Sequence, residues 1–310
     1  MHERFSNPQV LAAALDGHVL LCTDVATGDA VAIKRMHLAS AKTKLALGTS
    51  NRVSEDATME LHVHRILSAN GGHANVLRLR DHFHDESNLY LVLNYCPGGD
   101  LFTVLRTHGT LEMATVWTYF RQIVQGVAYM HRQGYAHRDL SLENILLDGN
   151  GNCCVCDFGL ATPVSAWVSQ KVGKLFYMAP EVVAAALYDP TKADVWSLGI
   201  MLFMLVTGTP LLGVASNMDR RYRYMISHGL QRLVAHTYKQ RIDAKVMMLL
   251  EGMLATDPRL RLTLDDVVKR MGESRGQLSH RTTIGQTIKR WFQPKKNGGQ
   301  PIDEPLILGI

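Results

Sequence analysis

Features that would assign this chain to a specialised class of protein are largely missing from its 310 residues. No run of five like charges occurs, and 33 basic against 28 acidic residues leave a formal net charge of only +5. This balance gives little support to nucleic-acid binding, and we expect no nucleic-acid partner. No segment repeats with a period of about 20 to 50 residues, which argues against a solenoid.

Cysteine is scarce and unevenly placed. The five cysteines are Cys22, Cys96, Cys153, Cys154 and Cys156. An odd count, with three members in one apolar stretch, does not fit a disulfide framework. The first ten residues, "MHERFSNPQV", also lack the basic start and apolar run of a signal peptide. We therefore expect a reducing compartment, cytoplasmic or nuclear.

Long hydrophobic runs are also absent. The most apolar stretch, "VWSLGIMLFMLVTG", covers residues 195–208. It is shorter than the ~20 apolar residues that a helix needs to cross a bilayer. We therefore predict a buried core helix and no transmembrane segment.

The chain does contain enough apolar sequence, 46% of its residues, for one large domain or two lobes. Its first part has the pattern of short strands around one helix, and its later part has the spacing of amphipathic helices. Strands are expected over residues 17–25, 29–36 and 88–95, and helices over residues 55–70, 111–134, 193–208 and 243–255. The sequence thus indicates an α+β fold in which a small β-rich lobe precedes a larger helical lobe.

A lysine lies inside one of the predicted strands, at the end of "VAIK". A charged group in an apolar strand is costly unless it is paired. The natural partner of Lys34 is Glu60, on the helix predicted next along the chain. The alternative is a lysine on the exposed face of an edge strand.

Four further motifs follow in order. They are "HRDLSLEN" with Asp139 and Asn144, "DFG" at Asp157–Gly159, "APE" at Ala179–Glu181, and "DVWSLG", which begins with Asp194. Together with "VAIK", they resemble in order and spacing the motifs of eukaryotic-type protein kinases. The resemblance covers residues 8–271, and "YCPGGDLF" and "GGHANVLRLRDHF" are most similar to the calmodulin-dependent and related serine/threonine groups.

The resemblance implies a two-lobed protein-kinase fold, with a small antiparallel β-sheet and one main helix in the N-lobe and a mostly helical C-lobe. The N-lobe would cover about residues 8–93, the hinge 94–99 and the C-lobe 100–271, with a tail at 272–310. The resemblance also implies phosphoryl transfer from ATP, with Mg²⁺, to serine or threonine hydroxyls of protein substrates. Tyrosine kinases usually carry an arginine two or four residues after the catalytic aspartate, and this chain does not.

Phosphoryl transfer requires that the triphosphate is held, that metal ions neutralise its charge and that a base receives the hydroxyl proton. By resemblance, Lys34 with Glu60 anchors phosphates, Asp139 is the base, and Asn144 and Asp157 bind Mg²⁺. The other residues expected around the nucleotide are Gly17, Val19, Ala32, Leu93, Tyr95, Cys96, Asp100, Glu143 and Leu146. The same resemblance implies that Glu181 pairs with Arg261 and that Asp194 braces the catalytic loop, His137–Asn144.

Acidic residues near the acceptor bear on substrate choice. The counterparts of Asp100 and Glu143 in basophilic kinases face arginines of the substrate, so substrates with basic residues near the acceptor are favoured. Met204 occupies a position that is acidic in some of those enzymes. We therefore expect the preference for basic substrates to be weak.

The first departure from the kinase pattern lies in the glycine-rich loop. The pattern G-x-G-x-x-G-x-V, counted back from Val19 and Gly17, places Ala12 and Ala14 where glycines are usual. Glycine lets the backbone approach phosphates closely and adopt positive φ. We therefore expect a stiffer or more distant loop and weaker contacts to the nucleotide.

The second departure lies in the catalytic loop. Ser141 stands where serine/threonine kinases usually have lysine, and Lys174, in "VGK", stands where they usually have threonine. In the family, that lysine contacts the γ-phosphate and the catalytic aspartate, and the threonine hydrogen-bonds both residues. We hypothesise that the two have exchanged roles, so that Lys174 takes part in catalysis beside Asp139. The alternative is a solvated lysine on a mobile loop.

Two other classes of function compete with an active protein kinase. The two alanines and Ser141 would suit a nucleotide-binding pseudokinase that acts as a scaffold or allosteric partner. A small-molecule kinase of related fold is disfavoured, because the "APE" segment belongs to the protein-kinase pattern. Turnover that depends on Asp139 would separate an active kinase from a binding protein.

The activation segment, Asp157–Glu181, contains one candidate for control. In many kinases the arginine that precedes the catalytic aspartate binds a phosphate on this segment. Arg138 is that arginine, and Ser169 is the hydroxyl residue nearest the usual phosphorylation site. Gln170 aligns with the site itself.

The C-terminal tail is the other candidate. Ile284, Ile288 and Trp291 have helical spacing, with basic residues beside them. This pattern is typical of a short helix packed on the large lobe or of a loose tail. It also suits a regulatory segment that binds a calmodulin-type partner.

One further motif resembles the beginning of a calcium-binding loop. "DGNGN", residues 148–152, begins like such a loop, but Cys153 and Gly159 stand where it needs glycine and glutamate. We predict a hairpin turn before Asp157 instead.

Overall fold

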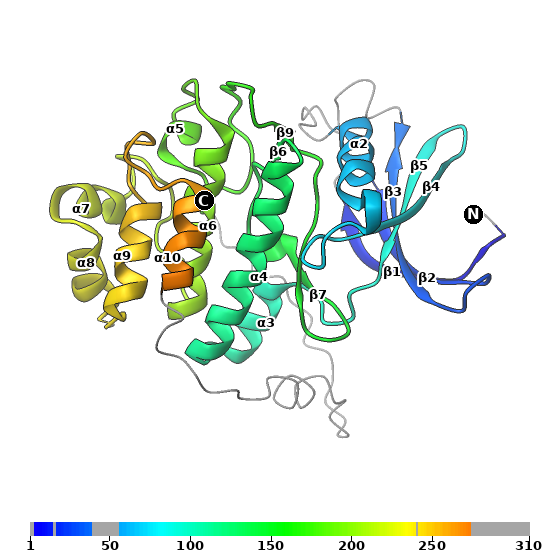
Figure 1. Cartoon of the computed structure of the whole chain (residues 1–310), viewed down its shortest axis with the longest axis horizontal. Helices are drawn as coiled ribbons and strands as arrows, with labels where there is room; N and C mark the ends of the chain where they lie inside the picture. The colour runs from blue at the N-terminus through cyan, green and yellow to red at the C-terminus, as the bar shows by residue number, and fades with distance from the viewer. Residues whose placement is uncertain (1–2, 15–16, 39–55, 240, 274–310) are drawn as a thin grey trace.

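The computed structural model describes residues 3–14, 17–38, 56–239 and 241–273, and Figure 1 shows that they form two lobes. The smaller lobe contains a five-stranded sheet and helix α2, and the larger lobe is mostly helical. The predicted fold class is therefore confirmed. The predicted helix around residues 284–291 lies outside the described residues.

The sheet of the N-lobe is antiparallel, with strand order β1-β2-β3-β5-β4. Its strands are β1 (Phe5–Ala14), β2 (Gly17–Asp24), β3 (Ala30–His37), β4 (Leu79–His84) and β5 (Asn88–Asn94). The register of β3 and β5 places Lys34 opposite Leu91 and Ala32 opposite Leu93. Because side chains alternate along a strand, these four lie on one face of the sheet.

Helix α2 (Ala57–Ser68) packs beside this sheet and is followed by the short helix η1 (Ala69–Gly71). It begins after Asp56, whose carboxylate accepts hydrogen bonds of 2.9 and 3.1 Å from two backbone N–H groups of the first turn. Glu60, Val63, His64 and Leu67 are buried on one side of the helix. Their spacing is that of an amphipathic helix, so Glu60 points inward although it is charged.

Gly17 begins β2 in close contact with β3. A Cβ atom at this position would lie 1.8 Å from the carbonyl oxygen of Arg35, which no side chain can tolerate. On the other strand of the hairpin, β1 continues as strand through Ala12, which pairs with Val19. Residues 15–16 lie outside the described residues, and the expected effect of the alanines on nucleotide contacts stays a prediction.

The C-lobe packs its helices around α4 and α6. Its helices are α3 (Leu101–His108), α4 (Met113–Arg132), α5 (Pro180–Val183), α6 (Pro190–Thr207), α7 (Arg220–His228), α8 (Leu230–Leu233), η3 (Val234–Tyr238), α9 (Ala244–Met253) and α10 (Leu264–Glu273). Nearly all of α6 is buried, so the most apolar stretch forms the core helix that was predicted. In the part of the chain that the structure describes, no helix is long and apolar enough to cross a membrane.

Short elements between the lobes carry the catalytic segments. They are β6 (Tyr135–Ala136), η2 (Leu142–Asn144), β7 (Ile145–Leu147), β8 (Cys153–Val155) and β9 (Thr162–Pro163). β7 and β8 pair as a hairpin, and Oδ1 of Asp148 closes its turn by accepting hydrogen bonds of 2.8 Å from the backbone N–H groups of Asn150 and Asn152. The hairpin turn predicted from "DGNGN" is thereby confirmed.

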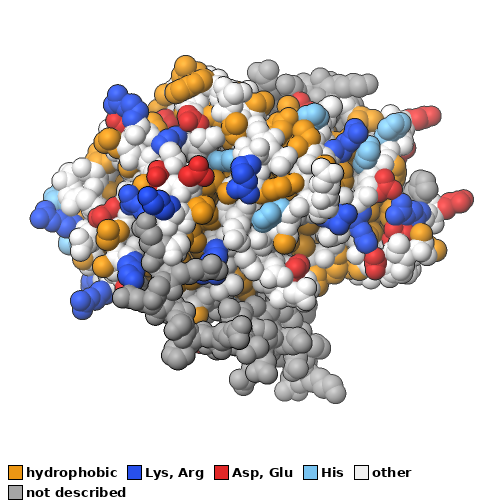
Figure 2. All heavy atoms as spheres, viewed as in Figure 1, with side chains coloured by type: hydrophobic (Ala, Val, Ile, Leu, Met, Phe, Trp, Pro, Cys, Tyr) orange, Lys and Arg blue, Asp and Glu red, His pale blue; other side chains and the backbone are white. Residues whose placement is uncertain are grey.

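Charge is mixed on the molecular surface. Figure 2 shows Lys and Arg side chains interspersed with Asp and Glu over both lobes, with hydrophobic side chains between them. This face therefore presents no extended field of one sign.

Candidate active site

Lys34 of β3 contacts two carboxylates where the lobes meet. Its Nζ atom donates hydrogen bonds to Oε1 and Oε2 of Glu60 at 2.8 and 2.9 Å, and to Oδ1 of Asp157 at 2.9 Å. The side chains of Lys34 and Glu60 are only 11% and 1% exposed. The interpretation of Lys34 as a lysine on an exposed strand face therefore does not hold. Its second carboxylate partner, Asp157, was not foreseen from the sequence.

Asp157 follows β8 with a left-handed backbone, at a φ of 65°. Burial alone would raise the pKa of Asp157, but the charge and hydrogen bond of Lys34 outweigh burial and hold it below its ordinary value. The carboxylate is therefore ionised at neutral pH. Because its side chain is 34% exposed, it can also reach a ligand.

The buried Asp194 of α6 holds the backbone of the catalytic loop. Its carboxylate oxygens accept hydrogen bonds of 2.8 Å from the backbone N–H groups of His137 and Arg138. Nε2 of His131 lies 2.8 Å from the same carboxylate. The backbone of Arg138 is left-handed, with a φ of 66°, a conformation that costs a non-glycine residue energy. Asp194 thus holds the loop in a conformation that it would not adopt freely.

Asn144 orients Asp139 directly. Its Nδ2 atom donates hydrogen bonds of 2.8 Å to the carbonyl oxygen and to Oδ2 of Asp139. The backbone N–H group of Lys174 donates to the other carboxylate oxygen, Oδ1, at 3.1 Å. The Asp139 carboxylate is therefore fixed from two sides, by the catalytic loop and by the activation segment.

The amine of Lys174 enters the catalytic loop. Nζ lies 2.9 Å from Oγ of Ser141, 3.4 Å from Oδ2 of Asp139 and 3.4 Å from Oδ1 of Asn144. Ser141 is fully buried, whereas the Lys174 side chain is 37% exposed. The lysine is therefore not simply solvated, and it lies in the position that an exchange of roles with Ser141 requires.

Apolar residues expected around the base of the nucleotide form one cluster. Its members from the predicted set are Val19, Ala32, Leu93, Cys96 and Leu146, which come from both lobes. Tyr95 lies next to Cys96 in the segment that joins the lobes. Apolar residues with a few polar groups beside them are typical of the lining of a small-ligand site.

Three polar side chains of the predicted site, those of Asp157, Asn144 and Lys34, have the chemistry that a magnesium–nucleotide complex needs. Carboxylate and amide oxygens are hard ligands, and Mg²⁺ is commonly bound by one or two protein groups together with substrate phosphates. Asp157 offers an ionised carboxylate, and Asn144 offers Oδ1, because its Nδ2 donates to Asp139; the Lys174 amine contacts this Oδ1 at 3.4 Å. Lys34 would add a positive charge for phosphates.

Asp100 and Glu143 already have partners within the chain. Asp100 caps helix α3, because its two carboxylate oxygens accept from the backbone and side chain of Thr103 at 2.7 and 2.8 Å. Glu143 accepts a hydrogen bond of 3.0 Å from the hydroxyl of Tyr177. Both carboxylates therefore already accept hydrogen bonds from within the chain, so neither is reserved for a ligand.

Arg138 makes a contact that sequence analysis did not foresee. Its side chain donates hydrogen bonds to the carbonyl oxygen of Leu160 at 2.7 Å and to Oε1 of Gln170 at 2.8 Å. The hydroxyl of Tyr188 donates to the carbonyl oxygen of Gln170 at 2.9 Å. The alignment of Gln170 with a phosphorylation site was visible in the sequence, but the amide–guanidinium contact that ties the activation segment to Arg138 was not.

His64 of α2 is a second feature that the sequence did not reveal. Its ring contacts the ring of Phe158 with centroids 4.6 Å apart, and Phe158 contacts His137 at 5.7 Å. His64 is 1% exposed, and both of its ring nitrogens lack a hydrogen-bond partner. Burial lowers the pKa of His64 to about 3, so the ring is neutral. Helix α2 therefore contacts the "DFG" segment through a buried polar ring.

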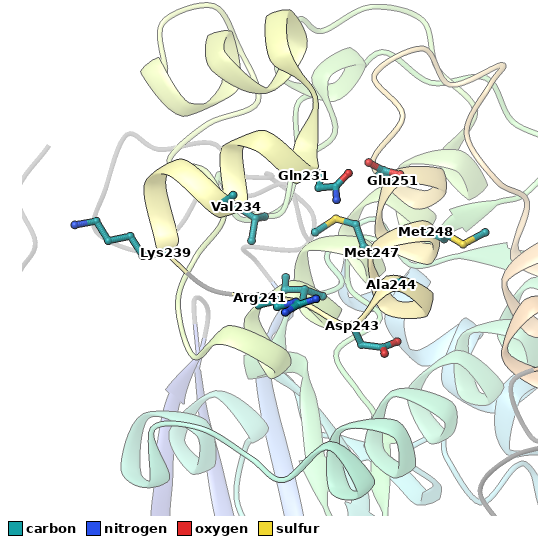
Figure 3. Close-up of a pocket in the computed structure, with 11 residues that line it drawn as sticks. Gln231, Val234, Lys239, Arg241, Asp243, Ala244, Met247, Met248 and Glu251 are labelled. Atoms are coloured by element: carbon teal, nitrogen blue, oxygen red, sulfur yellow. The ribbon is translucent and has the colours of Figure 1, made fainter.

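A separate hollow lies on the C-lobe between η3 and α9. It has a volume of about 1060 Å³, and Figure 3 shows Val234, Met247 and Met248 around it, with Lys239 extending away. None of the residues that line it belongs to the predicted site. The expected chemistry is therefore not located there.

The family model of the protein kinase domain matches residues 15–271 of the chain. The chain therefore belongs to the protein kinase family, as its motifs predicted, and several of its curated relatives are named as serine/threonine-protein kinases.

Three curated relatives illustrate the similarity. Mitosis inducer protein kinase cdr1 of Schizosaccharomyces pombe is 37% identical over 67% of this chain and 34% of its own length. Serine/threonine-protein kinase GIN4 of Saccharomyces cerevisiae is 32% identical over 84% of this chain and 23% of its own length. CBL-interacting protein kinase 15 of Oryza sativa is 28% identical over 99% of this chain and 70% of its own length. The chain thus spans between about a quarter and seven tenths of these relatives.

Proposed function

We propose that the protein is a serine/threonine kinase that transfers the γ-phosphoryl group of Mg²⁺-ATP, in line, to hydroxyl groups of protein substrates. The observation that carries the proposal is a pair of hydrogen-bonded groups, Lys34 with Glu60 and Asp157, and Asn144 with Asp139. These are the groups that phosphoryl transfer needs for anchoring, metal binding and proton acceptance.

Each group has a distinct role in this proposal. Lys34, oriented by Glu60, anchors the α- and β-phosphates. Asp157 and Asn144 hold Mg²⁺, which neutralises charge on the phosphates. Asp139, fixed by Asn144 and by the backbone of Lys174, orients the acceptor hydroxyl and accepts its proton.

Lys174 supplies the positive charge that the catalytic loop lacks. Ser141 and Asp139 hold its amine beside the catalytic carboxylate, at 2.9 and 3.4 Å. From there it can donate to the transferred phosphoryl group, where negative charge concentrates. Ser141 takes the hydroxyl role that a threonine on the activation segment has in related kinases.

The acceptor is serine or threonine on a protein, with at most a weak preference for nearby basic residues. Asp100 and Glu143 can attract such residues, but both already accept hydrogen bonds from within the chain. Leu175 and Phe176, which follow Lys174, are 46% and 49% exposed and offer apolar surface to the substrate. We place the protein in the cytoplasm or nucleus.

Regulation by a second protein is part of the proposal. Several relatives are named as CBL-interacting kinases. For this chain we propose only that a regulatory protein binds the tail, residues 272–310, a calmodulin-type partner being one form of it.

The test is transfer of phosphate from Mg²⁺-ATP to a mixed set of Ser, Thr and Tyr peptides, basic and neutral. The Asp139→Asn variant is measured beside the wild type, with nucleotide binding followed by calorimetry in both. We expect transfer to Ser and Thr that disappears in the variant while ATP binding persists. Transfer that is no greater in the wild type than in the variant, with ATP still bound, would show a nucleotide-binding scaffold instead.

A further inference from the structure

The hollow between η3 and α9 on the C-lobe has an apolar floor. Val234 of η3 and Met247 of α9 line it and are buried, and Met248, which also lines it, is 64% exposed. Its volume of about 1060 Å³ is as large as that of the largest common ligand pockets, ~1,000 Å³. The hollow therefore offers apolar surface that a further element can cover.

The wall that η3 forms has an unusual backbone. This element is a π-helix, and Lys239, which follows it, is left-handed with a φ of 51°. A π-helix is rare and is often found at functional sites, and a left-handed conformation costs a non-glycine residue energy. The turn leads through Arg241 into α9, and both cations belong to the lining of the hollow. The local strain makes this wall a candidate for a binding function.

The two cations remain able to bind an acidic group. Lys239 and Arg241 are exposed, and neither pairs with a carboxylate in the part of the chain that the structure describes. Of the two carboxylates in the lining, that of Asp243 already accepts a hydrogen bond of 2.9 Å from the first turn of α9. The other, Glu251, lies about two turns further along α9. The end of the hollow next to η3 is therefore its positive end.

The sequence around this end is strongly basic. Residues 219–248 contain two acidic residues, Asp219 and Asp243, and both cap helices. The same stretch has seven basic residues, namely Arg220, Arg221, Arg223, Arg232, Lys239, Arg241 and Lys245. Its excess of five positive charges equals the formal net charge of the whole chain. An occupant that matches the hollow is therefore both acidic and apolar.

One stretch of the chain outside the described residues has this chemistry. Residues 302–310, "IDEPLILGI", place Asp303 and Glu304 ahead of four aliphatic side chains and contain no basic residue. The rest of the tail, residues 274–301, has six basic residues and no acidic one, and residues 39–55 have three basic residues and one acidic one. Only residues 302–310 complement the hollow in both charge and apolar character.

The chain is long enough to bring this stretch to the hollow. Helix α10, which ends at Glu273, packs against α9. The 28 residues 274–301 can span up to ~90 Å. Because the stretch is tethered, its effective concentration at the hollow is of the order of mM. A contact too weak to form between separate molecules can therefore be occupied within one chain.

We propose that residues 302–310 dock in the hollow between η3 and α9. Asp303 and Glu304 lie beside Lys239 and Arg241, and the aliphatic side chains that follow cover the floor around Met247. The charges set the direction of the segment, and burial of aliphatic surface holds it. Under the proposed function, docking also tethers both ends of residues 274–301, within the tail for which a regulatory partner is proposed.

The first test traps the docked segment with a disulfide in the full chain. One variant carries Met248→Cys and Leu306→Cys, and its control carries Leu187→Cys and Leu306→Cys. Met248 and Leu187 are 64% and 66% exposed, and the five native cysteines are buried. Dilute protein is oxidised with oxidised glutathione, digested without reductant and mapped by mass spectrometry. We expect at least fivefold more cross-link within one chain for the Met248→Cys variant.

The other outcomes of this test contradict the proposal. Equal yields in the two variants would show that residues 302–310 have no preference for the hollow. A cross-link that joins two chains, seen as a dimer on a non-reducing gel, would assign the hollow to a second copy. A cross-link that dominates in the Leu187→Cys control would place the segment on another face of the C-lobe.

A charge exchange tests the direction of the segment. Arg241→Glu, added to the Met248→Cys and Leu306→Cys pair, should lower the yield several-fold. Asp303→Arg in the same chain should restore it, because the opposite charges then face each other again. A loss that Asp303→Arg deepens would show that these two residues do not meet.

Hydrogen exchange gives a measurement without engineered cysteines. Leu306→Asp should raise the exchange rates of amides in η3 and in the first two turns of α9 about tenfold, because the segment no longer covers them. Leu278→Asp, the same substitution in the basic part of the tail, should leave them unchanged. Equal rates in wild type and Leu306→Asp would show that the segment does not cover the hollow. None of these measurements needs nucleotide or phosphate transfer, so the docking and the kinase function can fail independently.

Discussion

The amine of Lys174 and the hydroxyl of Ser141 lie 2.9 Å apart, one on the activation segment and the other on the catalytic loop. Related serine/threonine kinases place the lysine on the loop and a hydroxyl on the segment. In this chain the same two chemical groups meet at the catalytic aspartate from opposite elements. Under the proposed function, this contact would make the position of the activation segment part of the charge arrangement around Asp139.

The first prediction concerns this exchange. Lys174→Met should lower kcat by roughly 10- to 100-fold, because a hydrogen bond from a charged group is worth about 1.5–3 kcal/mol in the transition state. Lys171→Met, the same substitution at an exposed position three residues earlier, should have little effect. Steady-state kinetics on one Ser peptide measures both. The double variant Ser141→Lys, Lys174→Thr should exceed the worse single variant, and if it does not, the exchange of roles is wrong.

The second prediction concerns the ion pair between Arg261 and Glu181. Their side chains are 0% and 9% exposed and are joined by hydrogen bonds of 2.6 and 2.9 Å. Arg261→Met should lower the free energy of unfolding by about 3–5 kcal/mol, because it leaves a buried carboxylate without its partner. Arg259→Met removes an exposed pair with Asp257 and should cause no measurable change. Urea unfolding compares the two, and equal losses would contradict this account.

The third prediction concerns the pH dependence of stability that His64 imposes. The folded chain holds the pKa of His64 at about 3, against 6.5 for an unperturbed ring, so only the unfolded chain takes up a proton as the pH falls below 6.5. Stability should therefore be full above pH 6.5 and decline toward acid by up to about 1.4 kcal/mol per pH unit. His64→Leu should remove this decline. It should also stabilise the protein near neutral pH, since two unpartnered ring nitrogens are lost.

The matched control for His64 is His62→Leu. His62 is exposed and contacts the hydroxyl of Tyr135 at 3.0 Å, so its replacement should not stabilise the protein. Thermal unfolding between pH 5 and 8 measures all three proteins. If wild type and His64→Leu decline in parallel, the histidine does not cause the acid sensitivity.

The fourth prediction concerns the glycine-rich loop. Ala12→Gly with Ala14→Gly should lower the KM for ATP by up to about tenfold, the value of one hydrogen bond of ~1.4 kcal/mol, because the backbone can then approach the phosphates. Ala13→Gly tests whether added flexibility alone is sufficient and should have a smaller effect. A KM that rises in the double variant would show that the alanines do not limit nucleotide contacts.

The fifth prediction concerns Gln170. Its contact with Arg138 holds the activation segment where a phosphate holds it in many kinases. Gln170→Ala should therefore lower kcat several-fold and make the segment more sensitive to limited proteolysis, whereas Ser169→Ala should change neither. Unchanged proteolysis of Gln170→Ala would show that the contact does not order the segment.

The pairings within the site could largely be predicted from the sequence, because each motif specifies a charge and its partner. Lys34 with Glu60 follows from the cost of burying a charge, Arg261 with Glu181 follows from the resemblance to protein kinases, and both pairs are present. The position of Lys174 beside Ser141 could be predicted because a lysine and a hydroxyl residue are exchanged relative to the protein-kinase pattern. Contacts between segments that no motif links could not be predicted in this way.

His64 and the pair Cys96 and Cys154 illustrate that limit. The pattern of apolar residues did not assign His64 to the buried face of its helix, because histidine is polar. The structure nevertheless buries this residue. The two cysteines are far apart in the chain, and the fold places both in one apolar cluster. Tertiary packing decides such contacts, whereas local sequence carries no signal for them.

The close approach of Gly17 to the carbonyl oxygen of Arg35 has a consequence for how degenerate kinases are recognised. Natural selection for a folded hairpin would keep this glycine whether or not the chain ever met a nucleotide. The presence of this glycine in an inactive descendant would therefore not indicate that phosphoryl transfer is retained. The absence of the other two glycines does not indicate that the hairpin fails to fold. A count of glycines in this loop therefore combines selection for a folded hairpin, which acts on Gly17, with selection for nucleotide contacts, which acts on the other two positions.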